Sequence, residues 1–237
     1  MERDEAVRRL RALEGQDLRQ LADLHAVTVW KGDKKNKGWA GHTIERYLGL
    51  PINSSQSPNF GSWELKLVPL KKLSGGEIVV KETMAITMID AVNVLDKPFE
   101  ESHLLAKLQK AVVCSRLFES QQESHSLLVR VATFDLGNEE IYNHVRADYE
   151  EVRQTIRTQG FQALTGAMGV LVQPRTKGAG HGSTSRAFYA RVGFVAKILG
   201  IWRTSHERAR PCRRREPRAR IEEREHPSAP PMALLSE

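Results

Sequence analysis

Residues 62–70, SWELKLVPL, alternate in character with a period of two, which is typical of a β-strand. The sequence LSGGE then turns the chain, and the β-branched run at residues 77–89 is expected to pair with this strand as a hairpin. Successive side chains of a strand point to opposite faces, so Glu64 and Lys66 project from the same face. The fold must therefore contain a strand that presents a carboxylate and an ammonium group together.

Segments with helical spacing interleave with these strand-like segments. Apolar residues recur at intervals of three and four in residues 5–24, 39–50, 99–113 and 139–160. A break is expected near Gly15, and Gly160 is expected to close the last helix. The run SHSLLVRVATFDL predicts a further strand. This order predicts an α/β fold class, with a mixed sheet flanked by helices.

The composition changes near residue 201. Residues 201–237 contain nine arginines, six acidic residues and five of the ten prolines of the chain, with almost no apolar periodicity. Such a segment buries too little apolar surface to offset its ordering entropy. We therefore expect a folded domain at residues 1–200 and a disordered basic Arg/Pro-rich tail at residues 201–237. The tail is either a solvated appendage or a contact for nucleic acid.

Net charge and cysteine content narrow the class of protein. The chain of 237 residues has 36 basic and 29 acidic side chains, a net charge of +7, which suits a polyanionic partner without identifying one. Cys114 and Cys212 are too few for a disulfide framework or a zinc site. No apolar run approaches the roughly 18 residues of a membrane span, and the start of the chain lacks a signal-peptide core. A cytoplasmic protein with no membrane association is expected.

The Glu64-Leu65-Lys66 triplet suits phosphodiester hydrolysis, which needs an activated water and compensation for developing negative charge. A carboxylate can bind a metal ion there, and Lys66 can stabilise the transition state. Alone, such a triplet is more often a solvated ion pair. Its context favours a nuclease, because Asn59 lies five residues upstream, where a PD-(D/E)xK nuclease carries a metal-binding aspartate. Glu45 lies further upstream, on a predicted helix that can approach the same point.

Five segments in the same order give the chain a resemblance to a known family. They are KGWAGHTIERYLGL, SPNFGSWELKLVPL, ESHLLAKLQKAVV, VLVQPRTK and SRAFYARVGF, within about residues 30–198. Together they resemble MutH, the nicking endonuclease of methyl-directed mismatch repair, and its relatives among the GATC-cutting type II restriction enzymes. The resemblance implies a PD-(D/E)xK restriction-endonuclease-like fold, whose two lobes form a cleft for double-stranded DNA. It implies a Mg²⁺-dependent DNA endonuclease, with Mn²⁺ as a substitute, that cuts at a short GATC-like site.

The resemblance also assigns expected roles to residues of this chain. Glu64 corresponds to the strand acid of the family, Glu45 to its helical acid, Lys66 to its catalytic lysine and Lys107 to a second active-site lysine. A magnesium ion would then be held by Glu64, Glu45 and Asn59. The implied partner is a MutL-type protein if the role is mismatch repair, or a cognate DNA methyltransferase if the role is restriction.

Three further residues correspond to the DNA-contacting arm of the family. Arg175 and Lys177 match residues that approach the DNA, and Tyr189 matches a residue that senses adenine methylation. The chain departs from the family at Asn59, where the family has aspartate, and it lacks two residues between this position and the Glu-x-Lys strand. Three alternatives follow: a working endonuclease, a catalytically impaired DNA-binding relative that lost metal binding through Asn59, and a nucleic-acid-binding fold without sequence preference.

Overall fold

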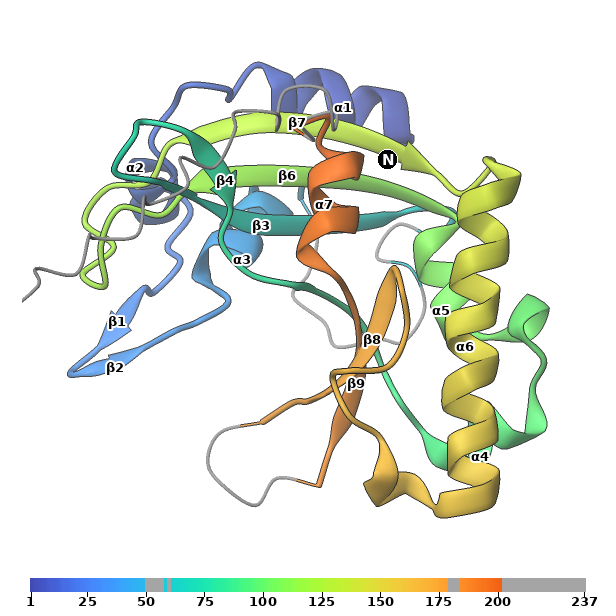
Figure 1. The fold of residues 1–237 in the computed structure, drawn as a ribbon. Coiled ribbons are helices and arrows are strands. Elements are labelled where there is room, and N and C mark those ends of the chain that lie inside the picture. The colour runs from blue at the N-terminus through green and yellow to red at the C-terminus, as the bar shows by residue number, and fades with distance from the viewer. Residues whose placement is uncertain (50–57, 59–60, 179–183, 202–237) are drawn as a thin grey trace, which may run out of the picture. The chain divides into compact units, whose positions relative to one another are not determined.

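The computed structural model describes residues 1–49, 58, 61–178 and 184–201 (Figure 1). In chain order its elements are α1 (Arg3–Arg11), α2 (Leu18–Leu24), β1 (Trp30–Lys31), β2 (Lys34–Lys35), α3 (Trp39–Tyr47), β3 (Glu64–Lys72), β4 (Ile78–Val80), β5 (Met84–Met88), α4 (Ala91–Asp96), η1 (Phe99–Glu101), α5 (His103–Leu108), β6 (Lys110–Leu117), β7 (Leu128–Asp135), α6 (Glu139–Gln159), η2 (Phe161–Ala163), β8 (Val172–Thr176), β9 (Arg186–Ala190) and α7 (Val192–Ile198). Helices and strands interleave, so the predicted α/β class is confirmed.

The larger sheet has four strands in the order β4-β3-β6-β7. Strand β3 runs parallel to β6, with Glu64 opposite Ala111, while the other two pairs are antiparallel. The apolar run of β6 suits a strand buried on both faces. Val112 belongs to the core on one side of the sheet, and Ala111 and Val113 belong to the core on the other side. The sheet is therefore covered on both faces.

The two faces are covered by different parts of the chain. Helices α1, α2 and α3 pack on one face, as Figure 1 shows for α1, around buried residues that include Leu10 and Trp39. Helices α5, α6 and α7 and the smaller sheet pack on the other face, around a cluster that includes Tyr149 and Phe188. Leu65 of β3 belongs to the first cluster. Because side chains alternate along a strand, Glu64 and Lys66 project toward the smaller sheet.

The smaller sheet has three antiparallel strands in the order β5-β9-β8. Its β8 strand is fixed at its start by Asp148 of α6, whose buried carboxylate accepts hydrogen bonds from the backbone N–H groups of Val170, Leu171 and Val172 at 2.6, 2.8 and 2.7 Å. Arg191 donates to four backbone carbonyls of the preceding loop, residues 166–169. These bonds hold β8 in a set position beside the larger sheet.

Most predicted elements are present, and two expectations about their extent are wrong. The first helical segment breaks near Gly15 as expected, and the long helix ends at Gly160, which has φ +87°. The helix expected at residues 99–113 ends at Leu108, because its last residues form β6. Only β4 of the expected hairpin pairs with β3, whereas β5 joins the smaller sheet. A short run buried on both faces has no periodicity that separates a helix from a strand.

Two further sequence predictions concern the C-terminal tail and the absence of a membrane span. Of the expected tail at residues 201–237, residues 202–237 lie outside the described residues. Within the described part of the chain, no helix combines the length and the apolar character needed to cross a membrane.

Candidate active site

Glu64, at the first position of β3, lies at the centre of a compact charged cluster. Its side chain is buried, with 2% of its surface exposed. The Oε1 atom lies 2.7 Å from Nζ of Lys66 and accepts a hydrogen bond from Nζ of Lys107 at 3.2 Å. Lys66 also donates to the backbone carbonyl of Ile86 in β5, at 3.2 Å. The cluster therefore joins the two sheets through one lysine.

Lys107 reaches this cluster because of how α5 begins. The Ser102 hydroxyl accepts a hydrogen bond from the backbone N–H of Leu105 at 3.1 Å and so caps the helix. The same hydroxyl donates to the carbonyl of Phe99 at 2.7 Å, which fixes the entry of the helix. Leu104 and Leu108 are buried, and Lys107 lies between them on the same side. The helix therefore aims Lys107 inward at Glu64.

The charges of the cluster perturb one another. Burial lowers the pKa of Lys66, and the neighbouring carboxylate of Glu64 opposes this effect. Burial raises the pKa of Glu45 on α3, and the charge of Glu64 raises it further, while Lys66 and Lys107 lower it. Because the interaction between charges weakens with distance, these effects place Glu45 near Glu64 and the two lysines. The structure thus brings together all four residues that the sequence proposed as catalytic.

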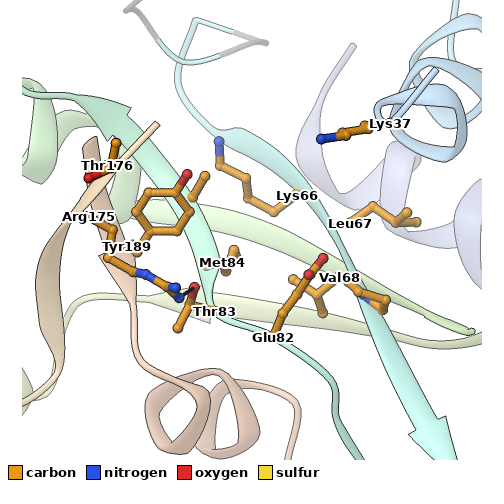
Figure 2. A pocket seen from close by; sticks show the side chains of 12 residues that line it. Lys37, Lys66, Leu67, Val68, Glu82, Thr83, Met84, Arg175, Thr176 and Tyr189 are labelled. Carbon is orange, nitrogen blue, oxygen red and sulfur yellow. Dashed lines mark hydrogen bonds between the residues drawn. The ribbon is translucent and has the colours of Figure 1, made fainter. Parts of the chain in front are cut away.

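A cavity of about 670 Å³ opens beside Lys66 (Figure 2). It is bordered by β3, by the β4–β5 connection with the start of β5, and by the smaller sheet. Its lining residues are Lys37, Lys66, Leu67, Val68, Pro69, Glu82, Thr83, Met84, Ala85, Arg175, Thr176 and Tyr189. Lys66 therefore contacts Glu64 in the buried cluster and also lines the cavity. The same cavity is lined by Arg175 and Tyr189, which the sequence analysis assigned to DNA contact.

Arg175 and Tyr189 form one unit on the smaller sheet. Arg175 is opposite Ala187, and Tyr189 is two residues further along β9, so their side chains are diagonal neighbours. The guanidinium carbon lies 5.8 Å from the centre of the Tyr189 ring. Arg175 also donates from Nη1 to the Thr83 hydroxyl at 2.8 Å (Figure 2). The guanidinium group is therefore held over the ring with a fixed direction.

Lys177 lies just beyond β8, where its backbone N–H donates to the carbonyl of Ser185 at 2.9 Å. Its positive charge contributes to the lowered pKa of Lys66. Burial raises the pKa of the Tyr189 hydroxyl, Arg175 lowers it and Glu82 raises it. All three residues proposed for DNA contact therefore lie near the proposed catalytic lysine.

The donors available for a metal ion are the two acids of the cluster. Among the described residues, no group of three or more His, Cys, Asp or Glu side chains forms a metal site. Mg²⁺ commonly takes only one or two protein carboxylates and completes its shell with water and phosphate oxygens. Glu64 and Glu45 fit that number. Burial and then the charge of Glu64 raise the pKa of Glu45, and a shared cation would offset both effects. Asn59, the third proposed ligand, lies outside the described residues.

Sequence reasoning missed four polar residues that line the cavity, namely Lys37, Glu82, Thr83 and Thr176. Lys37 belongs to a lysine-rich segment, KGDKKNKG, and this local enrichment is a signal that could have drawn attention to it. Glu82 and Thr83 stand in the connection before β5 and carry no motif. Their place beside Arg175 depends on β5 leaving the larger sheet, which the sequence pattern did not indicate.

A family model and several known proteins that are similar to this chain all carry the name MutH. A family model described as "DNA mismatch repair enzyme MutH" matches residues 48–140. The chain is 29% identical over 212 residues to the "DNA mismatch repair protein MutH" of Shewanella woodyi, covering 83% of this chain and 90% of that protein. It is 26% identical over 205 residues to the same-named protein of Klebsiella pneumoniae, covering 80% and 87%. The predicted resemblance to the MutH family is confirmed.

A restriction enzyme and one solved structure are also similar. The "Type II restriction enzyme Sau3AI" of Staphylococcus aureus is 25% identical over 181 residues, which cover 70% of this chain and 37% of that enzyme. A solved chain described as "Restriction endonuclease MvaI-cognate DNA substrate complex" matches with a TM-score of 0.33 and 12% identity, covering 76% of this chain and 95% of that chain.

Proposed function

We propose that this chain, a relative of the MutH mismatch-repair proteins, is a metal-dependent DNA endonuclease that hydrolyses phosphodiester bonds at a short specific site. One observation carries the proposal: Lys66 links the buried carboxylate of Glu64 to a cavity lined by Arg175 and Tyr189. An enzyme that cuts within its recognition site needs its catalytic residues beside its base-contacting residues, because the scissile phosphate then lies beside the recognised bases. The proposed recognition sequence is GATC-like, and the proposed compartment is the cytoplasm.

Each residue of the cluster has a role that its surroundings support. Lys66 holds its ammonium group at the boundary between the buried carboxylate and the cavity, so it can orient the attacking water or stabilise the charge that develops on the phosphate. Lys107, also hydrogen-bonded to Glu64, fixes the direction of that carboxylate and adds positive potential. Burial of the cluster strengthens these interactions, because less water screens them.

We propose that Glu64 and Glu45, with Asn59, hold the magnesium ion, for which manganese can substitute. When bound, the ion lowers the pKa of a water molecule and offsets the charge of the leaving oxygen. The chain's own contribution is to keep two carboxylates close together in a buried place, where burial first and then the charge of Glu64 raise the pKa of Glu45. Lys66 and Lys107 reduce the repulsion between the two carboxylates in the absence of substrate.

For sequence recognition we propose Arg175, Lys177 and Tyr189. A guanidinium group held by Thr83 and the Tyr189 ring is preorganised for a two-pronged hydrogen bond to guanine, which is worth about 1–3 kcal/mol of discrimination. Lys177 supplies charge near the phosphate. We propose that Tyr189, which lines the cavity, contacts the adenine whose methylation state the family senses.

The test is cleavage of a supercoiled plasmid that contains GATC sites, in Mg²⁺ or Mn²⁺. We expect nicked or linear product from the unmodified chain. The Lys66→Ala variant should be slower by about a hundred- to thousand-fold, because a transition-state charge contact is lost. Its affinity for duplex DNA should stay within a few-fold. A Lys66→Ala variant that cuts at the normal rate would refute the assignment.

The second candidate, a catalytically impaired DNA-binding relative, is favoured by one observation: the neutral amide at Asn59. An amide oxygen can bind Mg²⁺ but does not neutralise it. In this case the unmodified chain binds GATC duplexes without cutting them. Asn59→Asp should then restore cleavage, or lower the metal concentration that half-maximal cleavage requires. If the substitution changes neither quantity, Asn59 does not belong to the metal shell.

The response of the chain to a partner protein distinguishes a role in mismatch repair from a role in restriction. For mismatch repair we propose a MutL-type protein, whose addition should stimulate nicking of one strand. For restriction we propose a cognate DNA methyltransferase, whose action on the plasmid should prevent double-strand cleavage. Both measurements use the same plasmid and distinguish nicked from linear product.

A further inference from the structure

Strands β1 and β2 form a two-stranded ribbon whose two faces differ. Trp30 pairs with Lys35, and Lys31 pairs with Lys34, around a turn with Gly32 at φ +57°. Directly paired residues share one face of such a ribbon, and successive pairs alternate between faces. The Trp30–Lys35 pair therefore faces one way, and the Lys31–Lys34 pair faces the other way.

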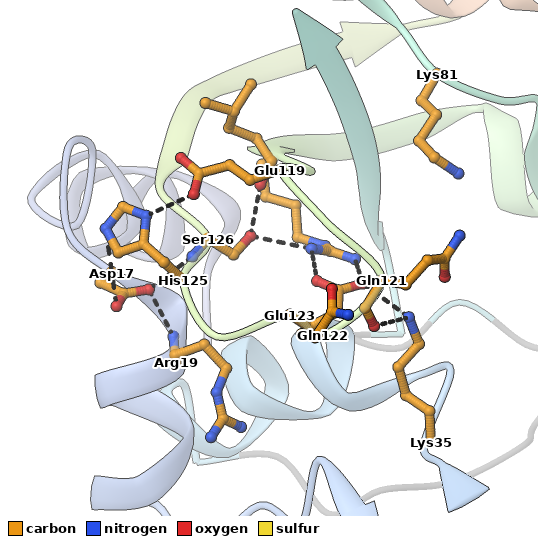
Figure 3. A network of polar contacts seen from close by, with 12 residues as sticks. Asp17, Arg19, Lys35, Lys81, Glu119, Gln121, Gln122, Glu123, His125 and Ser126 are labelled. Atoms are coloured by element: carbon orange, nitrogen blue, oxygen red, sulfur yellow. Dashed lines mark hydrogen bonds and ion pairs between the residues drawn. The ribbon is translucent and has the colours of Figure 1, made fainter. Parts of the chain in front are cut away.

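The Trp30–Lys35 face is attached to the loop after β6. The Trp30 indole N–H donates to the carbonyl of Gln122 at 3.0 Å. Lys35 Nζ lies 3.2 Å from a carboxylate oxygen of Glu123, as Figure 3 shows. Arg116 donates two hydrogen bonds to that carboxylate, of 2.6 and 2.9 Å. Burial opposes the charge of Glu123, but Arg116 and Lys35 outweigh this effect and keep its pKa below the ordinary value.

This anchoring explains how so short a ribbon keeps its shape. An isolated two-stranded hairpin is at best marginally stable in water. The bidentate Arg116–Glu123 pair is almost fully buried, and charge-assisted bonds of this geometry are strong and directional. Lys35 ties the ribbon to this pair. Among the described residues, the contacts that hold the ribbon come from its Trp30–Lys35 face.

The opposite face carries an arrangement that is unfavourable for the chain alone. Lys31 and Lys34 are both exposed and lie directly across from each other. Like charges at directly opposed positions of an antiparallel pair are destabilising. Asp33 in the turn offsets only part of this charge. A polyanion lying across the two ammonium groups would remove the repulsion.

The ribbon leads directly into the wall of the cavity. Lys37, two residues after β2, lines that cavity together with Lys66 and Arg175 (Figure 2). Figure 1 shows the ribbon projecting from the larger sheet on the side where β8 and β9 also project. A duplex that places its scissile phosphate at Lys66 would therefore continue past the ribbon.

We infer that Lys31 and Lys34 bind the phosphate backbone of duplex DNA outside the recognised sequence, with the anchored ribbon as a clamp. The inference rests on the proposed function, since it takes DNA as the ligand. Phosphate contacts of this kind add affinity and orientation but carry no sequence information. Each one releases condensed counterions, so it contributes about 0.9 to the slope of log K against log salt.

The test compares binding of two duplexes, one with a GATC site and one scrambled, over a range of salt concentrations without divalent metal. For Lys31→Gln/Lys34→Gln we expect the salt slope to fall by about 1.8 on both duplexes, and affinity near 0.1 M salt to fall by about ten-fold or more. Lys31→Arg/Lys34→Arg, which keeps the charge, should bind as the unmodified chain does. Lys71→Gln/Lys72→Gln, at the far end of β3, is the matched control for net charge.

Each other result has a definite meaning. An unchanged slope and affinity in Lys31→Gln/Lys34→Gln would overturn the clamp and leave the proposed endonuclease intact. A loss confined to the GATC duplex would also overturn it, because backbone contacts weaken both duplexes alike. If the unmodified chain binds neither duplex, the proposed function fails together with the clamp. Circular dichroism of each variant checks that the fold is unchanged.

Discussion

At the scale of single residues, the site depends on carboxylates kept close together in a buried place. Glu64 is compensated by two lysines, at 2.7 and 3.2 Å from the same oxygen. Glu45 is compensated less well, because burial and Glu64 together outweigh the two lysines and raise its pKa. A group strained in this way is typical of a functional site, where stability is given up for activity. Glu45 is therefore the residue at which function and stability should oppose each other.

We predict that Glu45→Gln raises the melting temperature at pH 7 and lowers cleavage. The raised pKa means that the folded chain binds the Glu45 proton more tightly than the unfolded chain. The stability from this proton is present at acid pH and is lost as the pH rises through the raised pKa. Glutamine is neutral at every pH, so its advantage should disappear below about pH 4. The gain should be a few degrees at most, since 1 kcal/mol corresponds to about 2–4 °C in a domain of this size.

Thermal melts at pH 7 and below pH 4 provide the measurement for this prediction. Glu5→Gln, on an exposed position of α1, is the control and should show no comparable pH-dependent gain. Equal melting temperatures for Glu45→Gln and the unmodified chain at both pH values would show that Glu45 is not destabilised by its neighbours.

At the scale of elements, the position of β8 decides whether Arg175 faces Lys66. That strand has few neighbours, being at the edge of a three-stranded sheet. Its start is held by the Asp148 carboxylate, which accepts three consecutive backbone N–H groups, and by Arg191, which closes the preceding loop. The residues on β8 and β9 that we propose for recognition thus take their position from α6, an element that does not line the cavity.

We predict that Asp148→Ala lowers stability by about 3 kcal/mol, because up to three backbone donors lose a charged acceptor in a mostly buried place. The corresponding fall in melting temperature is about 6–12 °C. Glu150→Ala, two residues further along α6 in a surface ion pair with Arg153, is the control and should cost less than about 1 kcal/mol. A melting temperature for Asp148→Ala within 2 °C of the unmodified chain would contradict the anchoring role.

At the scale of the whole molecule, sequence patterns indicated strand β3 better than they indicated its surroundings. The alternation in residues 62–70 was enough to predict that Glu64 and Lys66 share a face, because that period is a property of any strand. Strand periodicity could not predict that Lys107 approaches Glu64 or that Thr83 approaches Arg175. These approaches depend on how α5 packs and on β5 pairing with β9 instead of β3, which local spacing does not encode. The end of the helix at Leu108 was missed for a related reason, since burial on both faces hides the change from helix to strand.

We propose that the folded domain ends near residue 201 and does not need the basic tail. Ile201 still packs against the core, and Arg130 holds the carbonyls of Leu199 and Gly200 at 2.8 and 3.3 Å. A chain that stops after Ile201 should therefore melt within about 2 °C of the full chain. A truncated chain that is insoluble, or that melts without a cooperative transition, would show that residues after 201 belong to the core.

The most direct measurement is a map of the ends that the unmodified chain makes in a long linear DNA of known sequence, in Mg²⁺ and in Mn²⁺. A cluster around Glu64 and Lys66 that acts beside Arg175 and Tyr189 predicts breaks or nicks confined to one short sequence, GATC or a close variant. The Arg175→Ala variant should lose that confinement more than it loses affinity for scrambled DNA. Breaks spread over the DNA without sequence preference would contradict site-specific cleavage. Failure to cut in either metal, before and after Asn59→Asp, would contradict the catalytic role of the cluster itself.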